Sequence, residues 1–461
     1  MTIASTAALL VVESPAKALT LRRWLGPGWE VRATSGHLLD LPRHREGIDL
    51  ARGFEPTWEL VRGRSRTLSE LKRAARQAGR VVLATDPDRE GEGIAWQLAS
   101  ELGAEGGSPR VARVLLRELT PEAVLLALGR PVPLDRARAE AQLARRVVDR
   151  LIGYRLSARL SSALRPGLTA GRVQAAALRL AAGWEPPPAP TAGVAQPPPP
   201  FTTETLLVAA AERLNLRPRR AMALAQRLYE GVELGDGGRT GLITYPRTGS
   251  TWVSPAADGG VRELVAARQG PSSLDAAPSG RAPDGPAGGQ EALRPTSLDW
   301  PPERTLEPLR AAGGRDLQRV YALIWNRFVD SRMAPAHPTG RPVARPGPRP
   351  GAGRLDDAAL LAALASRGVG RPSTFASIGE SLEARGYLTR SSGALQVTPL
   401  GRRVVAWLDR TFPRTLDADF TAGLESRLDE VEAGRLPWRE AVAWAWGPLE
   451  RVLALPGAGP S

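Results

Sequence analysis

The chain has 461 residues and a formal charge of +14, from 62 basic and 48 acidic side chains. A chain of this length is too long for a single core, so we expect about three or four domains. The absence of cysteine excludes disulfides, zinc ribbons and thiol chemistry. The positive charge suits a polyanionic partner such as nucleic acid.

The positive charge is concentrated in one part of the chain. Residues 136–182 hold ten Arg against Glu140 and Asp149, a surplus of eight out of the net 14. An Arg-rich proteome would explain the use of Arg in place of Lys, but it would not explain this clustering. No stretch approaches the roughly 20 apolar residues of a membrane span, and the apolar opening lacks the basic flank of a signal peptide. We therefore expect a cytoplasmic protein without a membrane anchor.

Residues 8–12 have the composition of a buried strand, and a helix capped by Ser14 follows them. Glu13 lies at the end of this strand. Lys17 lies in the first helical turn, where a helix N-terminus favours phosphate. Glu13 could instead serve only to cap its own helix.

A second apolar run, residues 81–85, stops at three alternating carboxylates, Asp86, Asp88 and Glu90. A helical pattern resumes at residues 94–102, so the acids fill a strand-to-helix turn. Carboxylates this close repel one another unless a cation compensates, and Mg²⁺ prefers such oxygen ligands.

The bland alternative for this turn is a solvated acidic loop with Arg89 as its internal counter-ion. If the two strands are neighbours in one parallel sheet, however, Glu13 joins Asp86 and Asp88 at a shared crevice, where ligands of α/β sheets gather.

A basic helix is predicted over residues 139–160, with Arg146 and Arg150 one turn apart on a common face. Small residues then precede Arg172 and Gln174, which can hydrogen-bond a ligand. A basic helix alone is usually a solvated face, although its guanidiniums can lie along phosphates, and a basic helix followed by this segment is a more specific signal.

Proline-rich and glycine-rich residues at 183–200 and 335–353 predict two semi-rigid linkers. Between them, helical patterns lead to a predicted short strand at residues 242–248, which contains Tyr245 and Arg247. A phenol with a pKa near 10 is a poor nucleophile unless cations or a base favour the phenolate. The alternative is a buried structural tyrosine.

From residue 356 the pattern predicts a helix to 366, a second helix capped by Ser373, and a hairpin over 387–397. A helix-turn-helix followed by a wing binds nucleic acid in many proteins, and serves only as a packing unit in many others.

Three motifs resemble the toprim domain of the type IA DNA topoisomerases: Val-Glu-Ser-Pro-Ala-Lys at 12–17, Ser-Gly-His at 35–37 and Asp-Pro-Asp-Arg-Glu-Gly-Glu at 86–92. Tyr-Pro-Arg at 245–247 resembles the nucleophile segment of that family. A toprim nuclease or primase would leave the tyrosine motif and the segment at 169–174 unexplained.

The resemblance implies a multi-domain α/β plus α fold. Its parts are an N-terminal toprim (Rossmann-like) domain, a helical DNA-groove domain with a helix-turn-helix-like segment, and a helical, winged-helix-like tyrosine domain. The corresponding residues are 1–134 for the first, 135–182 and 354–458 for the second, and 201–334 for the third. The linkers stand where the family has a β arch, so we expect the arch to be reduced or absent.

The resemblance also implies functional residues. The catalytic set is Tyr245, Arg247, Glu13 and Lys17, and the Mg²⁺ ligands are Glu13, Asp86, Asp88 and Glu90. The implied DNA contacts are His37, Arg146, Arg150, Arg155, Thr169, Ala170, Gly171, Arg172, Val173, Gln174, Gln290, Arg294 and Arg371.

The implied activity is ATP-independent cleavage and religation of one DNA strand through a 5′-phosphotyrosine, which relaxes negatively supercoiled DNA. The expected partners are single-stranded and negatively supercoiled DNA, with no zinc, and the expected form is a nucleoid-associated monomer. Gly249 stands where the family usually has an acid, and Gln290 stands where it usually has His. These departures and the missing arch favour a rival reading, a non-catalytic or strand-passage-defective relative that binds single-stranded DNA.

Overall fold

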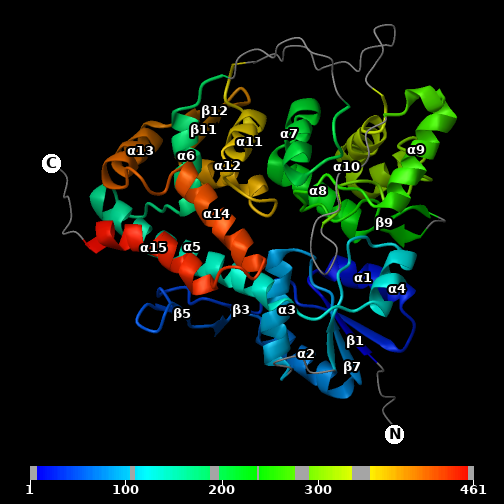
Figure 1. Ribbon diagram of the computed structural model, residues 1–461, viewed down its shortest axis with the longest axis horizontal. Helices are drawn as coiled ribbons and strands as arrows, with labels where there is room; N and C mark the ends of the chain where they lie inside the picture. The colour runs from blue at the N-terminus through cyan, green and yellow to red at the C-terminus, as the bar shows by residue number, and fades with distance from the viewer. Residues whose placement is uncertain are drawn as a thin grey trace.

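The computed structural model describes residues 8–103, 110–186, 197–235, 238–275, 290–334 and 353–454. Figure 1 shows an α/β region formed by the first part of the chain and two helical regions next to it. One helical region holds α7 to α10, and the other holds α6 and α11 to α15. No helix in these ranges is long and apolar enough to cross a membrane.

The α/β region is built on a four-stranded parallel sheet in the order β2-β1-β7-β8. The strands are Trp29–Ala33, Ala8–Val12, Arg80–Leu83 and Val111–Arg113, in that order across the sheet. Both faces are covered, because β1 is buried along its whole length. Leu9 and Val11 face the core shared with α2 and α3, and Leu10 and Val12 face the core shared with α1. The helices are α1 (Pro15–Trp24), α2 (Ser65–Gln77) and α3 (Arg89–Glu101).

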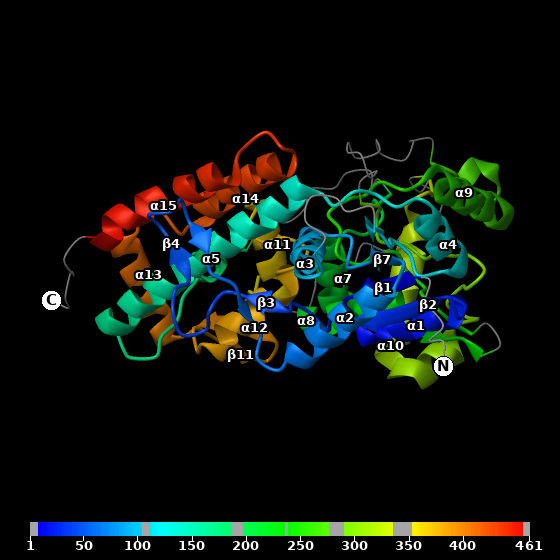
Figure 2. The same ribbon diagram turned by 90° about the horizontal axis from the view of Figure 1, so that it is seen from below.

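An excursion at residues 38–61 leaves this sheet and lies along α5 (Figure 2). Two short antiparallel pairs give it shape, β3 (Leu39–Asp40) with β6 (Glu59–Leu60) and β4 (Ile48–Asp49) with β5 (Glu55–Pro56). Beyond the four-stranded sheet, the described residues contain only two-stranded pairs, which agrees with a reduced β arch.

Helix α5 (Arg136–Ala163) connects the α/β region to the rest of the protein. Its 28 residues span about 42 Å at the usual rise of an α-helix, and it packs against α3 near one end and against α14 and α15 farther along. The basic helix predicted over 139–160 is therefore confirmed, and it is longer than expected.

The helical region that carries Tyr245 packs α7, α8 and α10 together. Its elements are α7 (Thr203–Leu214), α8 (Pro218–Glu230), β9 (Val232–Glu233), β10 (Arg239–Thr240), α9 (Pro255–Gln269), a 3-10 turn (Pro271–Ser273) and α10 (Leu306–Asp330). Helix α4 (Pro121–Gly129) precedes α5 in the chain. The prediction of a short strand at 242–248 is wrong, because this segment forms only an isolated bridge between Ile243 and Pro295.

The second helical region combines α6 with the C-terminal elements. They are α6 (Arg172–Ala182), α11 (Asp357–Ser366), α12 (Phe375–Ala384), β11 (Leu388–Ser391), β12 (Ala394–Val397), α13 (Pro399–Thr411), α14 (Ala418–Glu432) and α15 (Trp438–Ala454). The predicted helix-turn-helix and hairpin are confirmed, but the N-cap position of α12 is Thr374 rather than Ser373, and its side chain makes no capping hydrogen bond among the described residues. Helix α12 contacts both α6 and α8, so here it also serves as a packing unit.

Two further predictions concern the start of α3 and the two linkers. Helix α3 begins at Arg89 rather than near residue 94, which places Glu90 in its first turn. The predicted linkers fall mainly on residues 187–196 and 335–352, which lie outside the described residues.

Candidate active site

The carboxyl ends of β1 and β7 bring Glu13 and Asp86 together. The two strands are parallel neighbours, and the backbone N–H of Asp86 donates a hydrogen bond of 2.8 Å to Glu13 Oε1. Glu13 and Asp86 therefore meet at the ends of neighbouring parallel strands, as expected from the sequence. Burial, and then the charge of Asp86, raise the pKa of Glu13 to about 7.

Residues 86–90 form an acidic turn whose backbone is tightly constrained. Asp88 caps α3 by accepting a hydrogen bond of 2.8 Å from the backbone N–H of Gly91. A Cβ on Gly91 would lie 2.1 Å from the carbonyl oxygen of Asp86, so the turn has no room for a side chain there. The hydroxyl of Thr85 closes it by donating to the carbonyl of Gly91 at 2.7 Å.

A buried arginine that sequence reasoning missed supports the same turn. Arg113, on β8, pairs with Glu92 at 2.9 Å and donates to the carbonyl oxygens of Thr85 at 3.0 Å and Asp86 at 2.9 Å. Its side chain has no exposed surface. The signal in the sequence was an arginine inside the apolar run Val-Ala-Arg-Val-Leu, where a buried cation needs several partners.

Lys17 is also completely buried, and its ammonium pairs with Asp86 Oδ1. The same ammonium lies 5.0 Å from the centroid of the Tyr229 ring. Burial alone would lower the pKa of Lys17, but the carboxylate of Asp86 raises it above its ordinary value, so this side chain stays charged. In this structure Lys17 therefore compensates the charge of Asp86.

Tyr245 points into the acidic turn. Its hydroxyl donates to Asp88 Oδ2 at 2.7 Å and lies 3.2 Å from Asp86 Oδ2. Its backbone N–H is held by the carbonyl oxygen of Arg117 at 2.9 Å. Burial, followed by the charges of Asp88 and Asp86, raises the pKa of Tyr245 well above 10, so the phenol here is a neutral donor.

Arg247 and His37 complete the charged cluster. The Arg247 guanidinium lies 3.6 Å from Asp88 and 3.7 Å from Glu90, and its side chain is 28% exposed. His37 Nε2 lies 3.2 Å from Glu90 Oε1. Burial opposes a charged imidazole, but the hydrogen bond to Glu90 and the negative charges of Glu90 and Asp40 together raise the pKa of His37.

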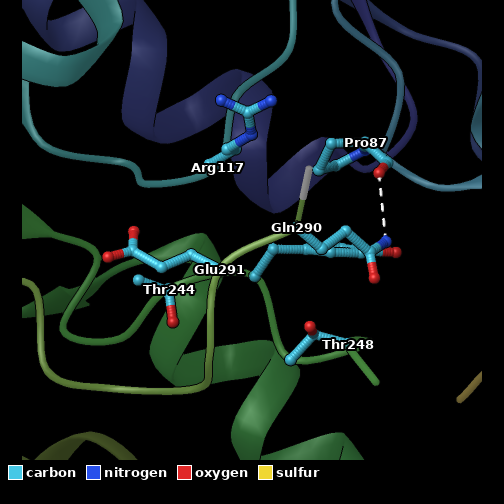
Figure 3. Close-up of a pocket in the computed structure, with 7 residues that line it drawn as sticks. Pro87, Arg117, Thr244, Thr248, Gln290 and Glu291 are labelled. Carbon is cyan, nitrogen blue, oxygen red and sulfur yellow. Dashed lines mark hydrogen bonds between the residues drawn. The ribbon is translucent and has the colours of Figure 1, made fainter. Parts of the chain in front are cut away.

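Gln290 lies above the nucleophile segment, in a small pocket lined also by Pro87, Arg117 and Thr248 (Figure 3). Its side-chain amide donates to the carbonyl oxygen of Pro87 at 3.3 Å, so it connects the tyrosine region to the acidic turn. At Gly249 an added Cβ would meet none of the described residues within 4 Å, at a position where the resembling family usually has an acid.

Arg294 is buried beneath this pocket instead of facing it. Its guanidinium pairs with Glu118 at 2.5 Å and with Glu291 at 2.8 Å. Its backbone N–H donates to the hydroxyl of Thr244 at 3.0 Å, so Arg294 holds the residue that precedes Tyr245.

The predicted groove arginines on α5 contact the excursion at residues 38–61. Arg146 binds both carboxylate oxygens of Asp40 at 2.6 Å, and Arg155 binds Glu46 at 2.6 and 2.8 Å. Arg150 donates to the carbonyl oxygen of Leu41 at 3.2 Å. These side chains remain partly exposed, in reach of solvent along the helix.

The segment at residues 169–174 turns into α6, with Gly171 at the N-cap. The hydroxyl of Tyr387 donates to the carbonyl oxygen of Thr169 at 2.8 Å, and Ala170 is held by Ser157 at 3.1 Å. Val173 is buried and Gln174 is partly exposed.

Arg172 and Arg371 both reach the acidic side chains of α14. Arg172 is fully buried and pairs with Asp149 at 3.0 Å and Glu425 at 2.9 Å. Arg371 lies 3.5 Å from Glu425 and 3.2 Å from Asp429. The sequence did not indicate that these arginines would form salt bridges with acidic side chains of α14.

Comparisons with known proteins agree with this geometry. The family described as DNA topoisomerase matches residues 191–341 and 350–443, and the Toprim domain, which generally binds Mg²⁺, matches residues 8–118.

A relative, DNA topoisomerase 1 of Treponema pallidum (strain Nichols), is 35% identical over 548 residues, covering 94% of this chain and 74% of the relative. The aligned stretch is longer than the 461 residues of this chain, so the relative carries internal segments that this chain lacks. The solved structure of full-length topoisomerase I from Thermotoga maritima superposes with a TM-score of 0.83 at 29% identity, covering 96% of this chain and 90% of that one. The chain therefore belongs to the type IA DNA topoisomerases of the bacterial topoisomerase I kind, enzymes that cut and rejoin one DNA strand through a phosphotyrosine without ATP.

Proposed function

We propose that Tyr245 is the nucleophile of this topoisomerase. The observation that carries the proposal is a comparison among the five tyrosines of the chain. Within the described parts of the chain, only the hydroxyl of Tyr245 contacts carboxylates. Those of Tyr229, Tyr321 and Tyr387 donate to backbone carbonyls, and Tyr154 is exposed on α5.

In the proposed reaction, Tyr245 Oη attacks a backbone phosphorus of single-stranded DNA. An Oη–P bond forms while the P–O3′ bond breaks, which leaves a 5′-phosphotyrosine and a free 3′-hydroxyl. The phenol loses one proton and the departing oxygen gains one, so the step is balanced. Religation reverses it, and no ATP is required because the ester retains the bond energy.

Charged side chains around Tyr245 support this chemistry. Arg247 lies beside the acidic turn with part of its surface exposed, where it would stabilise charge that develops on a phosphate. Lys17 would do the same once DNA displaces its contact with Asp86. Because its pKa lies near 7, Glu13 is present in both protonation states at neutral pH, which suits both a proton donor and a metal ligand.

The acidic turn also fits Mg²⁺ in its donor chemistry, since every candidate ligand is a carboxylate oxygen. Among the described residues, no three such side chains converge enough to hold a metal alone. Mg²⁺ is commonly bound by one or two protein carboxylates together with waters and substrate phosphate. The proposed ligands are Asp86 and Asp88, flanked by Glu13 and Glu90; the bound ion would supply positive charge that positions the 3′ end for religation.

The proposed DNA path runs from the acidic turn along α5. The contacts are His37, Gln290, Arg146, Arg150, Arg155, Arg371 and residues 169–174. Arg172 would act through Asp149 and Glu425, with which it pairs, and Arg294 would act through its hydrogen bond to Thr244. Phosphate contacts of this kind are independent of sequence and weaken steeply with salt.

The domain division is part of the same proposal. Residues 1–134 form the toprim domain, 135–182 with 354–458 form the groove domain, 201–334 carry the nucleophile, and 183–200 and 335–353 replace the arch. The proposed substrate is negatively supercoiled DNA, relaxed by a monomer at the nucleoid.

One experiment tests the nucleophile. Purified protein is incubated with single-stranded DNA, with and without Mg²⁺, and quenched with denaturant. A 3′-end label should stay with the protein, and a 5′-end label should leave on a shorter free strand. Tyr245→Phe removes only one hydroxyl and should abolish the adduct. Tyr321→Phe removes a comparable buried hydroxyl, which donates to the backbone carbonyl of Trp300 and not to a carboxylate, and should retain the adduct.

Two results would contradict the proposal. An adduct that persists in Tyr245→Phe would assign the chemistry to another residue. Retarded DNA without an adduct under any condition would leave the rival reading, a single-strand-binding relative that has lost cleavage, which the glycine at 249 and the glutamine at 290 favour.

A further inference from the structure

A second tyrosine, Tyr229, touches two members of the proposed catalytic set at once. It lies near the end of α8 and has no exposed surface. Its ring meets that of Tyr245 edge-on, with centroids 5.2 Å apart and planes at 72°. The ammonium of Lys17 lies 5.0 Å from the same ring centroid.

The hydroxyl of Tyr229 adds a third contact, to the α/β region. It donates a hydrogen bond of 2.6 Å to the carbonyl oxygen of Leu116. The neighbouring carbonyls also hold the nucleophile segment, since Arg117 accepts from the N–H of Tyr245 at 2.9 Å and Leu119 accepts from Gly241 at 2.7 Å. Tyr229 therefore lies at the contact between the helical region that carries Tyr245 and the segment that follows β8.

We propose that Tyr229 is a positioning residue for strand cleavage, which fixes the ring of Tyr245 and the ammonium of Lys17 relative to each other. This inference rests on the proposed role of Tyr245 as the nucleophile. An aromatic ring suits both contacts, because edge-to-face pairs prefer this separation and angle and a ring face attracts a cation.

A plain packing role would be satisfied by any apolar side chain of similar volume. Three features together are specific to a tyrosine here: a ring near a buried ammonium, an edge-to-face contact with the ring of the nucleophile, and a donor for the backbone carbonyl of the buried Leu116. Burial raises the pKa of Tyr229, which keeps the hydroxyl protonated as that donor.

The test is single-turnover cleavage of a 3′-labelled oligonucleotide at saturating protein, with Tyr229 replaced by Phe, by Leu, and by phenylalanines carrying increasing numbers of ring fluorines. Fluorine withdraws charge from the ring face near Lys17, with little change of shape. We expect a graded fall of the cleavage rate across the fluorinated series, and a loss of about tenfold to a hundredfold in Tyr229→Leu. DNA binding should change little, because Tyr229 is buried.

Tyr321 provides the matched control. It is a buried tyrosine on α10 whose hydroxyl also donates to a backbone carbonyl, and the same replacements there should leave cleavage unchanged. The Phe and fluorinated variants keep the ring, so the test remains decisive if Tyr229→Leu fails to fold.

Two outcomes separate the inference from the proposed function. If Tyr245→Phe abolishes the adduct but every Tyr229 variant cleaves as its Tyr321 counterpart does, the positioning role is wrong and the nucleophile stands. If Tyr245→Phe still forms the adduct, the proposed function itself has failed.

Discussion

The guanidinium of Arg89 donates to the carboxylate of Glu432, 343 positions later in the chain, at 2.6 and 2.8 Å. Asp429 accepts from the same guanidinium at 2.8 Å. Arg89 lies between Asp88 and Glu90, so this contact ties the acidic turn to α14. The acidic side chains of α14 therefore pair with Arg172 and Arg371 and also hold the turn that carries the proposed metal site.

We predict that Arg89→Glu weakens both the fold and cleavage, because it places three carboxylates together in a partly exposed contact. The free energy of unfolding should fall by about 1–2 kcal/mol. Adding Glu432→Arg should restore much of the stability and of the Mg²⁺-dependent religation, which denaturant melts and adduct reversal would measure. The exposed pair Arg23–Glu233 is the control, since the same reversal there should change stability by less than about 1 kcal/mol. A double variant no better than the single one would contradict the role of this pair.

Gly91→Ala should displace the acidic turn. The new methyl would sit 2.1 Å from the carbonyl oxygen of Asp86, so the backbone that carries this carboxylate must move. We expect a cost of about 1–3 kcal/mol in unfolding free energy and a clear loss of cleavage. Gly259→Ala, in α9 with nothing within 4 Å of the added Cβ, should be neutral or slightly stabilising. Full activity in Gly91→Ala would show that the turn tolerates the shift.

Glu13 should make stability depend on pH when no metal is present. Its folded pKa of about 7 lies above the ordinary 4.5, so the folded protein keeps a proton that the unfolded chain loses. Stability should therefore fall as pH rises from 4.5 to 7. Glu13→Gln removes this carboxylate and should raise the unfolding free energy at pH 8 by up to about 3 kcal/mol, with little effect near pH 4.5. Thermal melts in EDTA at both pH values would measure this, and an equal effect at both would contradict it.

Glu425 should behave in the opposite way. Burial alone would raise its pKa, but Arg172 and then Arg145 lower the pKa of Glu425 to about 2. Its contribution is therefore present above pH 4.5 and is lost as the pH falls toward 2. Glu425→Gln leaves the buried Arg172 short of a partner and should cost about 3–5 kcal/mol at pH 7. The exposed Glu430→Gln on the same helix should be silent in denaturant melts. Equal stability of the two variants would contradict the account.

The parts of this site that follow from local patterns could be predicted from the sequence. Glu13 and Asp86 each follow a buried strand, and parallel strands end at one edge, so their meeting required only that the strands be neighbours. Tyr245 was found by its motif, although the segment that carries it is not a strand.

The partners of buried arginines could not be predicted in the same way. Arg172 pairs with Glu425 across 253 positions and Arg294 pairs with Glu118 across 176, and neither pairing leaves a local signature in the chain. The sequence likewise gives no sign of a role for Tyr229, which falls within a helical pattern of apolar residues. Its contacts with Lys17 and Tyr245 appear only when α8 is placed against the sheet.

The most direct test of the central claim is to locate the covalent bond itself. Protein trapped on single-stranded DNA would be digested with nuclease and protease, and the nucleotide-modified peptide would be identified by mass spectrometry. We predict a 5′-linked nucleotide on the phenolic oxygen of Tyr245, in the peptide that contains Thr-Tyr-Pro. A modified peptide from any other part of the chain, or none despite bound DNA, would contradict the account.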